Sequence, residues 1–188
     1  MGLELMATLL VWRHPKPAAV KGRCIGWTDV AVDRRKIKRL AHRIRTRARR
    51  ESLARVIHTS PLRRCAEVGR QLARWGWRHH IDPRLSEMSF GEWDGRPWGD
   101  IGEPAVDAWC RDFGQHRAGG GESVADVLRR CAQFLAAGAD TPVTCVVGHA
   151  GWISAAQWLA RGESRAPAAS EWPAALPYAH ALLLQARC

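Results

Sequence analysis

The sequence predicts an α/β fold with a mainly parallel central sheet. Short apolar runs rich in strand-forming residues alternate with helical patterns of ten or more residues, and this alternation requires crossover connections. The chain has 188 residues, of which 46% are hydrophobic and 25% charged, so we expect one globular domain over residues 1–188. No apolar stretch reaches the ~20 residues of a membrane-spanning helix, so we expect no membrane association.

The first expected strand covers residues 8–12, and the prolines Pro15 and Pro17 prevent its continuation. Asp33 is a suitable N-cap for the helix that follows. Apolar residues recur in that helix at helical spacing, namely Ile37, Leu40, Ala41, Ile44 and Ala48. Arginines fill its other faces, so this is an amphipathic helix with a basic outer surface.

A second strand is expected over residues 53–58. Ser60 is a typical N-cap and Pro61 a typical first helical residue, so we expect the next helix to begin there. Further along, Ser123 and Asp126 have the spacing of a capping box, which predicts another helix.

The most strand-like run covers residues 142–147 and leads into a helix over residues 152–160; a last strand is expected over residues 179–184. In parallel sheets, ligands bind beyond the carboxyl ends of the strands. His14 and His149 each follow an apolar run, so we expect both at that edge.

The six cysteines are scattered and lack metal-ligand spacing: Cys24, Cys65, Cys110, Cys131, Cys145 and Cys188. Cys65 has no evident paired base and is interpreted as a packing residue. The N-terminal segment carries Glu4 and no basic region, which argues against a secretory signal. We therefore expect reduced thiols and a cytoplasmic location.

The net charge of +11 is concentrated in one segment. Eleven of the 29 Lys and Arg residues, but only one of the 18 Asp and Glu residues, lie between positions 34 and 55. This segment has three interpretations. It is a solvated outer face, it steers anionic substrates, or it binds nucleic acid or an acidic partner.

Several single residues suggest a functional site, although a simpler structural explanation also exists. Arg63 and Arg64 fall in the first turn of a helix, where cations are unfavourable unless an anion binds there or the side chains turn into solvent. His149 lies between Gly148 and Gly151, which permit close approach of a ligand to the backbone. Glu87 has apolar neighbours that suit a general acid, although an exposed loop carboxylate is the simpler interpretation.

Five motifs occur in an order and at spacings that resemble one known family: Arg13-His14, Ser60-Pro61-Leu62-Arg63-Arg64, Glu87-x-x-Phe90-Gly91-x-Trp93-x-Gly95, Gly121-Glu122-Ser123 and Gly148-His149-Ala150-Gly151. This family is the histidine phosphatase superfamily, also called phosphoglycerate-mutase-like. The resemblance covers residues 9–154 and is greatest to the α-ribazole phosphatase branch. It implies a three-layer α/β/α sandwich.

The resemblance also implies roles. His14 matches the nucleophile, Arg13 and Arg64 match the clamp on the phosphoryl oxygens, His149 matches the fourth member of that pocket, and Glu87 matches the general acid. It implies a metal-independent phosphomonoesterase that needs no cofactor and acts on a small phosphate ester. The branch implies α-ribazole 5′-phosphate, in cobalamin biosynthesis, as that ester.

The sequence departs from the family pattern at three places. Pro15 and Pro17 follow the first histidine, where the family has residues that contact phosphate, and Ser154 occupies a position where many members have arginine. Only 84 residues separate Arg64 from His149, which favours a phosphatase over a phosphoglycerate mutase, the alternative within the superfamily. A homodimer is compatible with the sequence. The alternative outside catalysis is a phosphatase-like domain that binds nucleic acid or an acidic partner through its arginine-rich helix.

Five of the ten tryptophans fall into two groups. Trp12, Trp109 and Trp158 lie in strand or helix patterns and are expected in the core. By the resemblance, Trp27 and Trp93 border the mouth of the pocket, where they would stack on an aromatic leaving group.

Overall fold

A five-stranded sheet organises the protein in a computed structural model that describes residues 6–18, 20–137 and 141–187. Its strands, in the order β3-β2-β4-β1-β5, are β3 (Arg78–Ile81), β2 (Val56–Thr59), β4 (Thr144–Gly148), β1 (Met6–Arg13) and β5 (Ala181–Arg187). All neighbouring pairs are parallel except β1 and β5. The prediction of a mainly parallel sheet is confirmed.

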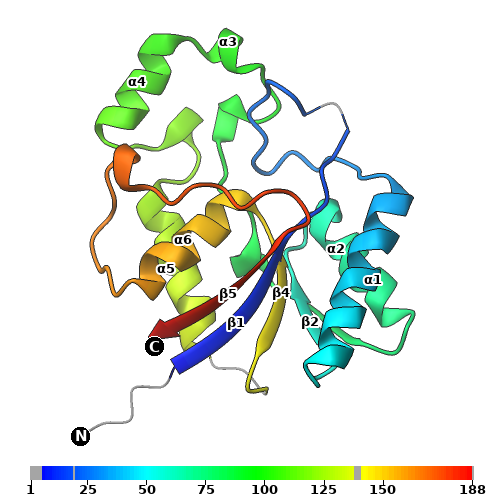
Figure 1. The fold of residues 1–188 in the computed structure, drawn as a ribbon. Coiled ribbons are helices and arrows are strands. Elements are labelled where there is room, and N and C mark those ends of the chain that lie inside the picture. Colours follow the sequence, from blue (N-terminus) through cyan, green and yellow to red (C-terminus); the bar gives the residue numbers. More distant parts are fainter. Residues whose placement is uncertain (1–5, 19, 138–140, 188) are drawn as a thin grey trace, which may run out of the picture.

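Helices cover both faces of the sheet. They are α1 (Arg34–Arg50), α2 (Arg63–Ala73), α3 (Trp98–Ile101), α4 (Glu103–Arg111), α5 (Val124–Ala136) and α6 (Ala150–Ala160). Figure 1 shows α1 and α2 on one face and α5 and α6 on the other, which confirms the three-layer sandwich. None of the helices in the described part of the chain is long and apolar enough to cross a membrane.

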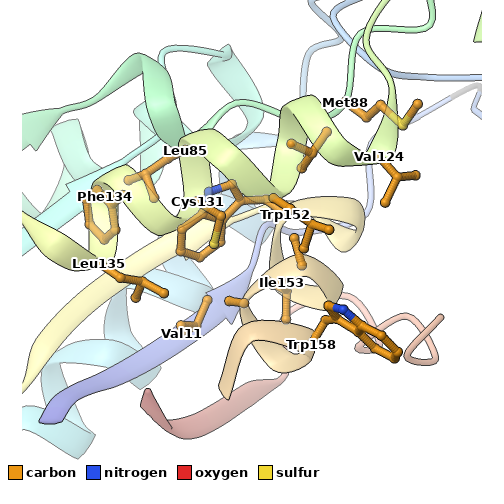
Figure 2. Close-up of a cluster of buried hydrophobic side chains, with 14 of the residues drawn as sticks. Val11, Leu85, Met88, Val124, Cys131, Phe134, Leu135, Trp152, Ile153 and Trp158 are labelled. Carbon is orange, nitrogen blue, oxygen red and sulfur yellow. The ribbon is translucent and has the colours of Figure 1, made fainter. Parts of the chain in front are cut away.

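The two cores follow from the alternation of side chains along each strand. In β1, Leu9 and Val11 belong to the cluster that packs against α5 and α6, where Trp152 is fully buried (Figure 2). Leu10 and Trp12 belong to the opposite cluster under α1 and α2. Because both faces of the sheet are buried at β1, the sequence of this strand is a continuous apolar run.

The expected start of one helix is wrong. The N-cap of α2 is Leu62, and the helix begins at Arg63, because the Ser60 hydroxyl accepts from the Leu62 N–H at 3.2 Å instead of from a helical N–H. This bond closes a tight turn between β2 and α2. Arg63 and Arg64 still lie in the first turn of α2, as predicted.

The other predicted helices and strands differ from the structure only at their ends. Asp33 caps α1, and the five predicted apolar residues of that helix are its buried residues. The capping box of Ser123 and Asp126 is present at α5. The helix expected over residues 152–160 starts earlier, at Ala150, directly after His149.

Candidate active site

The two histidines meet because of the register between β1 and β4. Arg13, the last residue of β1, is paired with Gly148, the last residue of β4. His14 and His149 therefore lie side by side just beyond the ends of these two strands. The backbone N–H of His14 donates to the Gly148 carbonyl at 3.0 Å. Their ring centroids lie 5.1 Å apart.

The imidazole of His14 is held with one nitrogen free. Its Nδ1 lies 2.9 Å from the Pro15 carbonyl oxygen. Because a carbonyl only accepts, Nδ1 carries the proton and Nε2 keeps its lone pair. Burial, together with the charges of Arg64 and Arg13, lowers the pKa of His14 to about 3, so the ring is neutral and nucleophilic at physiological pH.

The second histidine is fixed by an arginine. Arg64 Nε donates to His149 Nδ1 at 3.1 Å, so Nδ1 is the unprotonated nitrogen and Nε2 carries the proton. His149 is fully buried, and this burial and the charge of Arg64 hold its pKa well below the ordinary value. His149 is thus a neutral hydrogen-bond donor.

Arg64 is a buried cation without an acidic partner. Its side chain is 1% exposed and also donates to the backbone carbonyls of Gly26 and Thr28. Among the described residues, no ion pair joins Arg64 or Arg13 to a carboxylate. An uncompensated buried charge is costly, so this arrangement favours binding of an anion.

Arg13 is held beside the histidines by a segment that precedes β5. Its guanidinium carbon lies 3.8 Å from the centre of the Tyr178 ring, and one terminal nitrogen donates to the Leu176 carbonyl at 2.8 Å. The Arg13 Nε is buried and has no hydrogen-bond partner among the described residues. A phosphoryl oxygen would satisfy this donor.

Glu87 is buried against the N-terminus of α6. Its carboxylate oxygens accept from the Met88 N–H at 3.1 Å and from the Gly151 N–H at 3.2 Å. His149 is the N-cap of the same helix, so α6 places Glu87 and the two histidines around one point. The simpler expectation of an exposed loop carboxylate is wrong, because only 8% of Glu87 is exposed.

A third arginine, Arg130 of α5, holds the segment that carries Glu87. It donates to the carbonyls of Arg84, Ser86 and Glu87 at 2.6–3.1 Å. It also pairs with Glu122, which accepts from the Ser89 N–H. The glutamate of the Gly-Glu-Ser motif therefore positions the Glu87 segment through Arg130.

The structure brings together five of the predicted residues: Arg13, His14, Arg64, Glu87 and His149. The expectation for Trp93 is wrong, because this ring is 8% exposed in the hydrophobic core and packs edge-on against Trp109. Trp27 is 52% exposed and its indole N–H donates to the Glu87 carbonyl. Sequence reasoning missed Tyr178 and Arg130, since neither lies in a recognisable motif.

Two further positions bear on the site. Cys65 is buried beside His149, with its Sγ 3.3 Å from Nε2, and burial raises the pKa of its thiol, as suits a packing residue. The Ser154 hydroxyl donates to the Pro173 carbonyl and is buried. Among the described residues, no three His, Cys, Asp or Glu side chains are arranged to hold a metal ion.

Comparisons with known proteins identify the family and the fold. A sequence profile of the histidine phosphatase superfamily (branch 1) matches residues 9–175. The α-ribazole phosphatase from Shigella flexneri is 25% identical, with a TM-score of 0.76 over 96% of this chain and 94% of that chain. A mycobacterial glucosyl-3-phosphoglycerate phosphatase is 23% identical, with a TM-score of 0.75 over 94% and 89% of the two chains.

A protein described as mycobacterial hydrolase 2 has the same fold, with a TM-score of 0.79 at 24% identity over 97% of this chain and 83% of that one. No curated protein sequence matches the chain. The profile match covers most of the residues and includes all five motifs, so the chain belongs to the histidine phosphatase superfamily, branch 1.

Proposed function

We propose that the protein is a phosphomonoesterase that works through a phosphohistidine on His14. The observation that carries this proposal is the state of His14: a neutral ring with its Nδ1–H bonded to the Pro15 carbonyl and its Nε2 lone pair free. Arg13 and Arg64 lie beside it, and neither forms an ion pair with a carboxylate of the described residues. This combination suits attack on a phosphorus atom whose oxygens carry negative charge.

In the first step, His14 Nε2 attacks phosphorus, a P–N bond forms and the P–O bond to the leaving group breaks. Arg13 and Arg64 stabilise the charge on the equatorial oxygens, and the His149 ring, held by Arg64, is the fourth member of the pocket. The acid form of Glu87 gives its proton to the departing oxygen, which leaves as an alcohol.

In the second step, water replaces the leaving group. The Glu87 carboxylate takes a proton from this water as its oxygen attacks phosphorus. The P–N bond breaks, inorganic phosphate leaves, and the electron pair returns to His14 Nε2. Glu87 is then protonated again, so the cycle closes with no net change in the protein.

For the leaving group, we propose a small alcohol of the kind that the related phosphatases release. α-Ribazole 5′-phosphate is the first candidate, because the Shigella flexneri protein named as an α-ribazole phosphatase shares the fold over nearly all of both chains. The exposed ring of Trp27, held by its bond to the Glu87 carbonyl, would stack on the aromatic base of such a substrate.

The test is phosphate release in the presence of EDTA from a panel of esters. The panel holds 4-nitrophenyl phosphate, α-ribazole 5′-phosphate, nucleotides, sugar phosphates, glucosyl-3-phosphoglycerate and 3-phosphoglycerate. Turnover is expected to persist with EDTA and to fall by at least about 10³-fold in His14→Ala, with the exposed His42→Ala as the matched control. Turnover that EDTA abolishes, or that His14→Ala retains, would refute the mechanism.

A groove between α1 and α2 favours a second candidate function, the binding of nucleic acid. Its volume is about 340 Å³, and it is lined by the basic residues Arg34, Lys38, Arg63, Arg70 and Arg74 and by one acid, Glu67. Binding of DNA or RNA that weakens steeply with salt and persists in His14→Ala would support this function. Absence of binding at low salt would exclude it.

A further inference from the structure

A half-buried carboxylate, Asp94, joins two segments beside the candidate active site. Its Oδ1 accepts from the Gly26 N–H at 2.6 Å and from the N–H and the hydroxyl of Thr28, both at 3.2 Å. Its Oδ2 accepts from the Phe90 N–H at 3.1 Å. Asp94 therefore ties the loop of residues 26–28 (loop 26–28) to the segment that follows Glu87.

The charge of Asp94 acts only on these neutral donors, because Asp94 takes part in no ion pair among the described residues. Hydrogen bonds to an ionised acceptor are stronger than those between neutral groups. The two segments are also joined by their backbones, since the Gly95 N–H donates to the Cys24 carbonyl at 2.7 Å and the Cys24 N–H to the Arg96 carbonyl at 2.9 Å. A substitution of Asp94 therefore leaves the segments paired but removes the charge that holds loop 26–28.

Loop 26–28 in turn holds Arg64. The Arg64 guanidinium donates to the Gly26 carbonyl at 2.5 Å and to the Thr28 carbonyl at 2.8 Å. Its Nε donates to His149 Nδ1, so three bonds from different directions fix the plane of the group. Gly26 and Thr28 thus bind Asp94 through their N–H groups and Arg64 through their carbonyls.

Close packing makes loop 26–28 a stiff link. A Cβ at Gly26 would collide with the Met88 carbonyl oxygen and with the Phe90 ring. Between Gly26 and Thr28, the Trp27 indole donates to the Glu87 carbonyl at 2.7 Å. A shift at the Asp94 end of the loop is therefore passed on to the carbonyls at the Arg64 end.

From these contacts we infer that Asp94 is a positioning residue of the phosphate pocket. It holds loop 26–28 so that the Gly26 and Thr28 carbonyls orient the Arg64 guanidinium, and with it the ring of His149. Asp94 acts through Arg64 and not on the substrate itself. The effect on turnover rests on the proposed function, in which Arg64 binds the phosphoryl oxygens, whereas the effect on Arg64 does not.

Hydrogen exchange of the Arg64 Nε–H, followed by nuclear magnetic resonance, tests the inference directly. The signal is identified by its absence in Arg64→Lys, and it should exchange slowly in the parent chain because the group is buried and bonded to His149. In Asp94→Asn we expect exchange to be about tenfold faster or more, the effect of losing one charge-assisted hydrogen bond. Thr28→Val removes a single bond to Asp94 and should give a smaller acceleration.

The matched control is Asp126→Asn. Asp126 also accepts from a backbone N–H and a hydroxyl, those of Ser123, but none of its bonds reaches loop 26–28. This control should leave the exchange of the Arg64 Nε–H unchanged. The inference is overturned if that group is unprotected in the parent chain, if Asp94→Asn exchanges at the parent rate, or if both variants accelerate exchange equally, which would indicate a general loss of stability.

Turnover shows by which route Asp94 acts. Because Arg64 binds the phosphoryl oxygens whatever the leaving group, Asp94→Asn should lower kcat/KM by roughly 10²-fold for both 4-nitrophenyl phosphate and an alkyl phosphate. In an Arg64→Lys background the same substitution should add little further loss. A loss confined to the alkyl ester would indicate a route through Glu87 and would overturn the inference. If the parent chain hydrolyses no ester, the proposed function fails, while hydrogen exchange still decides whether Asp94 positions Arg64.

Discussion

At the scale of single residues, hydrogen-bond partners determine which ring nitrogen of each site histidine carries the proton. The Pro15 carbonyl can only accept and the Arg64 guanidinium can only donate, so His14 is protonated on Nδ1 and His149 on Nε2. Pro15 lacks the N–H that the family pattern has at this position, but its carbonyl still orients the His14 ring. Position 15 therefore acts on His14 through its backbone.

Arg130 is the residue whose role is most open to a direct test. We expect Arg130→Met to lower kcat by roughly 10²-fold with a small change in KM, because displacement of a positioned catalytic group by about 1 Å costs that much. The physical cause is loss of the bonds to the carbonyls of Ser86 and Glu87. Steady-state kinetics with an alkyl phosphate, whose leaving group needs protonation, is the measurement.

The neighbouring Arg129→Met is the control, since Arg129 is exposed and, among the described residues, its ion pair is with Asp126. Equal kcat values for the two variants would show that Arg130 does not position Glu87. Thermal unfolding of both variants reports any loss of stability separately.

At the scale of elements, α6 is the part of the fold that assembles the site. Its N-cap is His149, and its Gly151 N–H holds the Glu87 carboxylate. A Cβ at Gly151 would stand 2.5 Å from Glu87 Oε1, closer than real contacts allow. The Glu87 side chain as it lies here, and not the backbone conformation of the helix, therefore leaves no room for a Cβ at position 151.

We expect Gly151→Ala to lower kcat for alkyl phosphates by about 10²-fold or more, the usual contribution of general acid catalysis, because the Glu87 side chain must swing away. The stability of the fold should be maintained, since alanine favours the helix by up to about 1 kcal/mol. Kinetics and urea unfolding of Gly151→Ala, Glu87→Gln and the double variant measure both effects. If the double variant is much slower than Glu87→Gln alone, the glycine acts by another route.

At the scale of the whole molecule, charge and burial are unevenly distributed. The excess positive charge lies on α1, where it lines the groove shared with α2. The buried histidines are neutral. Burial is the largest cause that lowers the pKa of His14, of His149 and of the half-buried His79.

This burial predicts a pH dependence of folding stability. The unfolded chain binds a proton on each histidine near pH 6.5, whereas the folded chain does so only at lower pH, about 3 for His14. Because the unfolded state binds more protons, the free energy of unfolding falls as pH drops below 6.5. The slope approaches about 1.4 kcal/mol per pH unit for each fully shifted histidine.

Urea unfolding between pH 7 and pH 5, where most carboxylates stay ionised, measures this slope. His14→Asn keeps a side-chain donor for the Pro15 carbonyl and should reduce the slope by one proton. His42→Asn, at an exposed position of α1, should leave it unchanged. A flat profile in the unmodified protein would contradict the assignment of neutral buried histidines.

The sequence by itself determined most of the helices and strands and most of the residues of the candidate site. Helical periodicity identified every buried residue of α1, and the capping box placed the start of α5, because such signals act within one or two turns of the chain. Strand alternation with helices predicted the parallel sheet. The order of motifs then indicated the five residues that gather at its edge.

Only the tertiary structure decided which groups face one another. Trp93 lies in the core because Trp109 packs against it from α4, Tyr178 covers Arg13 because β5 runs antiparallel beside β1, and Glu87 is held by Arg130 from α5. Each contact joins segments that lie 16 or more positions apart, and in the last two more than 40 positions apart. Their geometry depends on strand register and on helix packing across the sheet, which no local pattern in the sequence encodes.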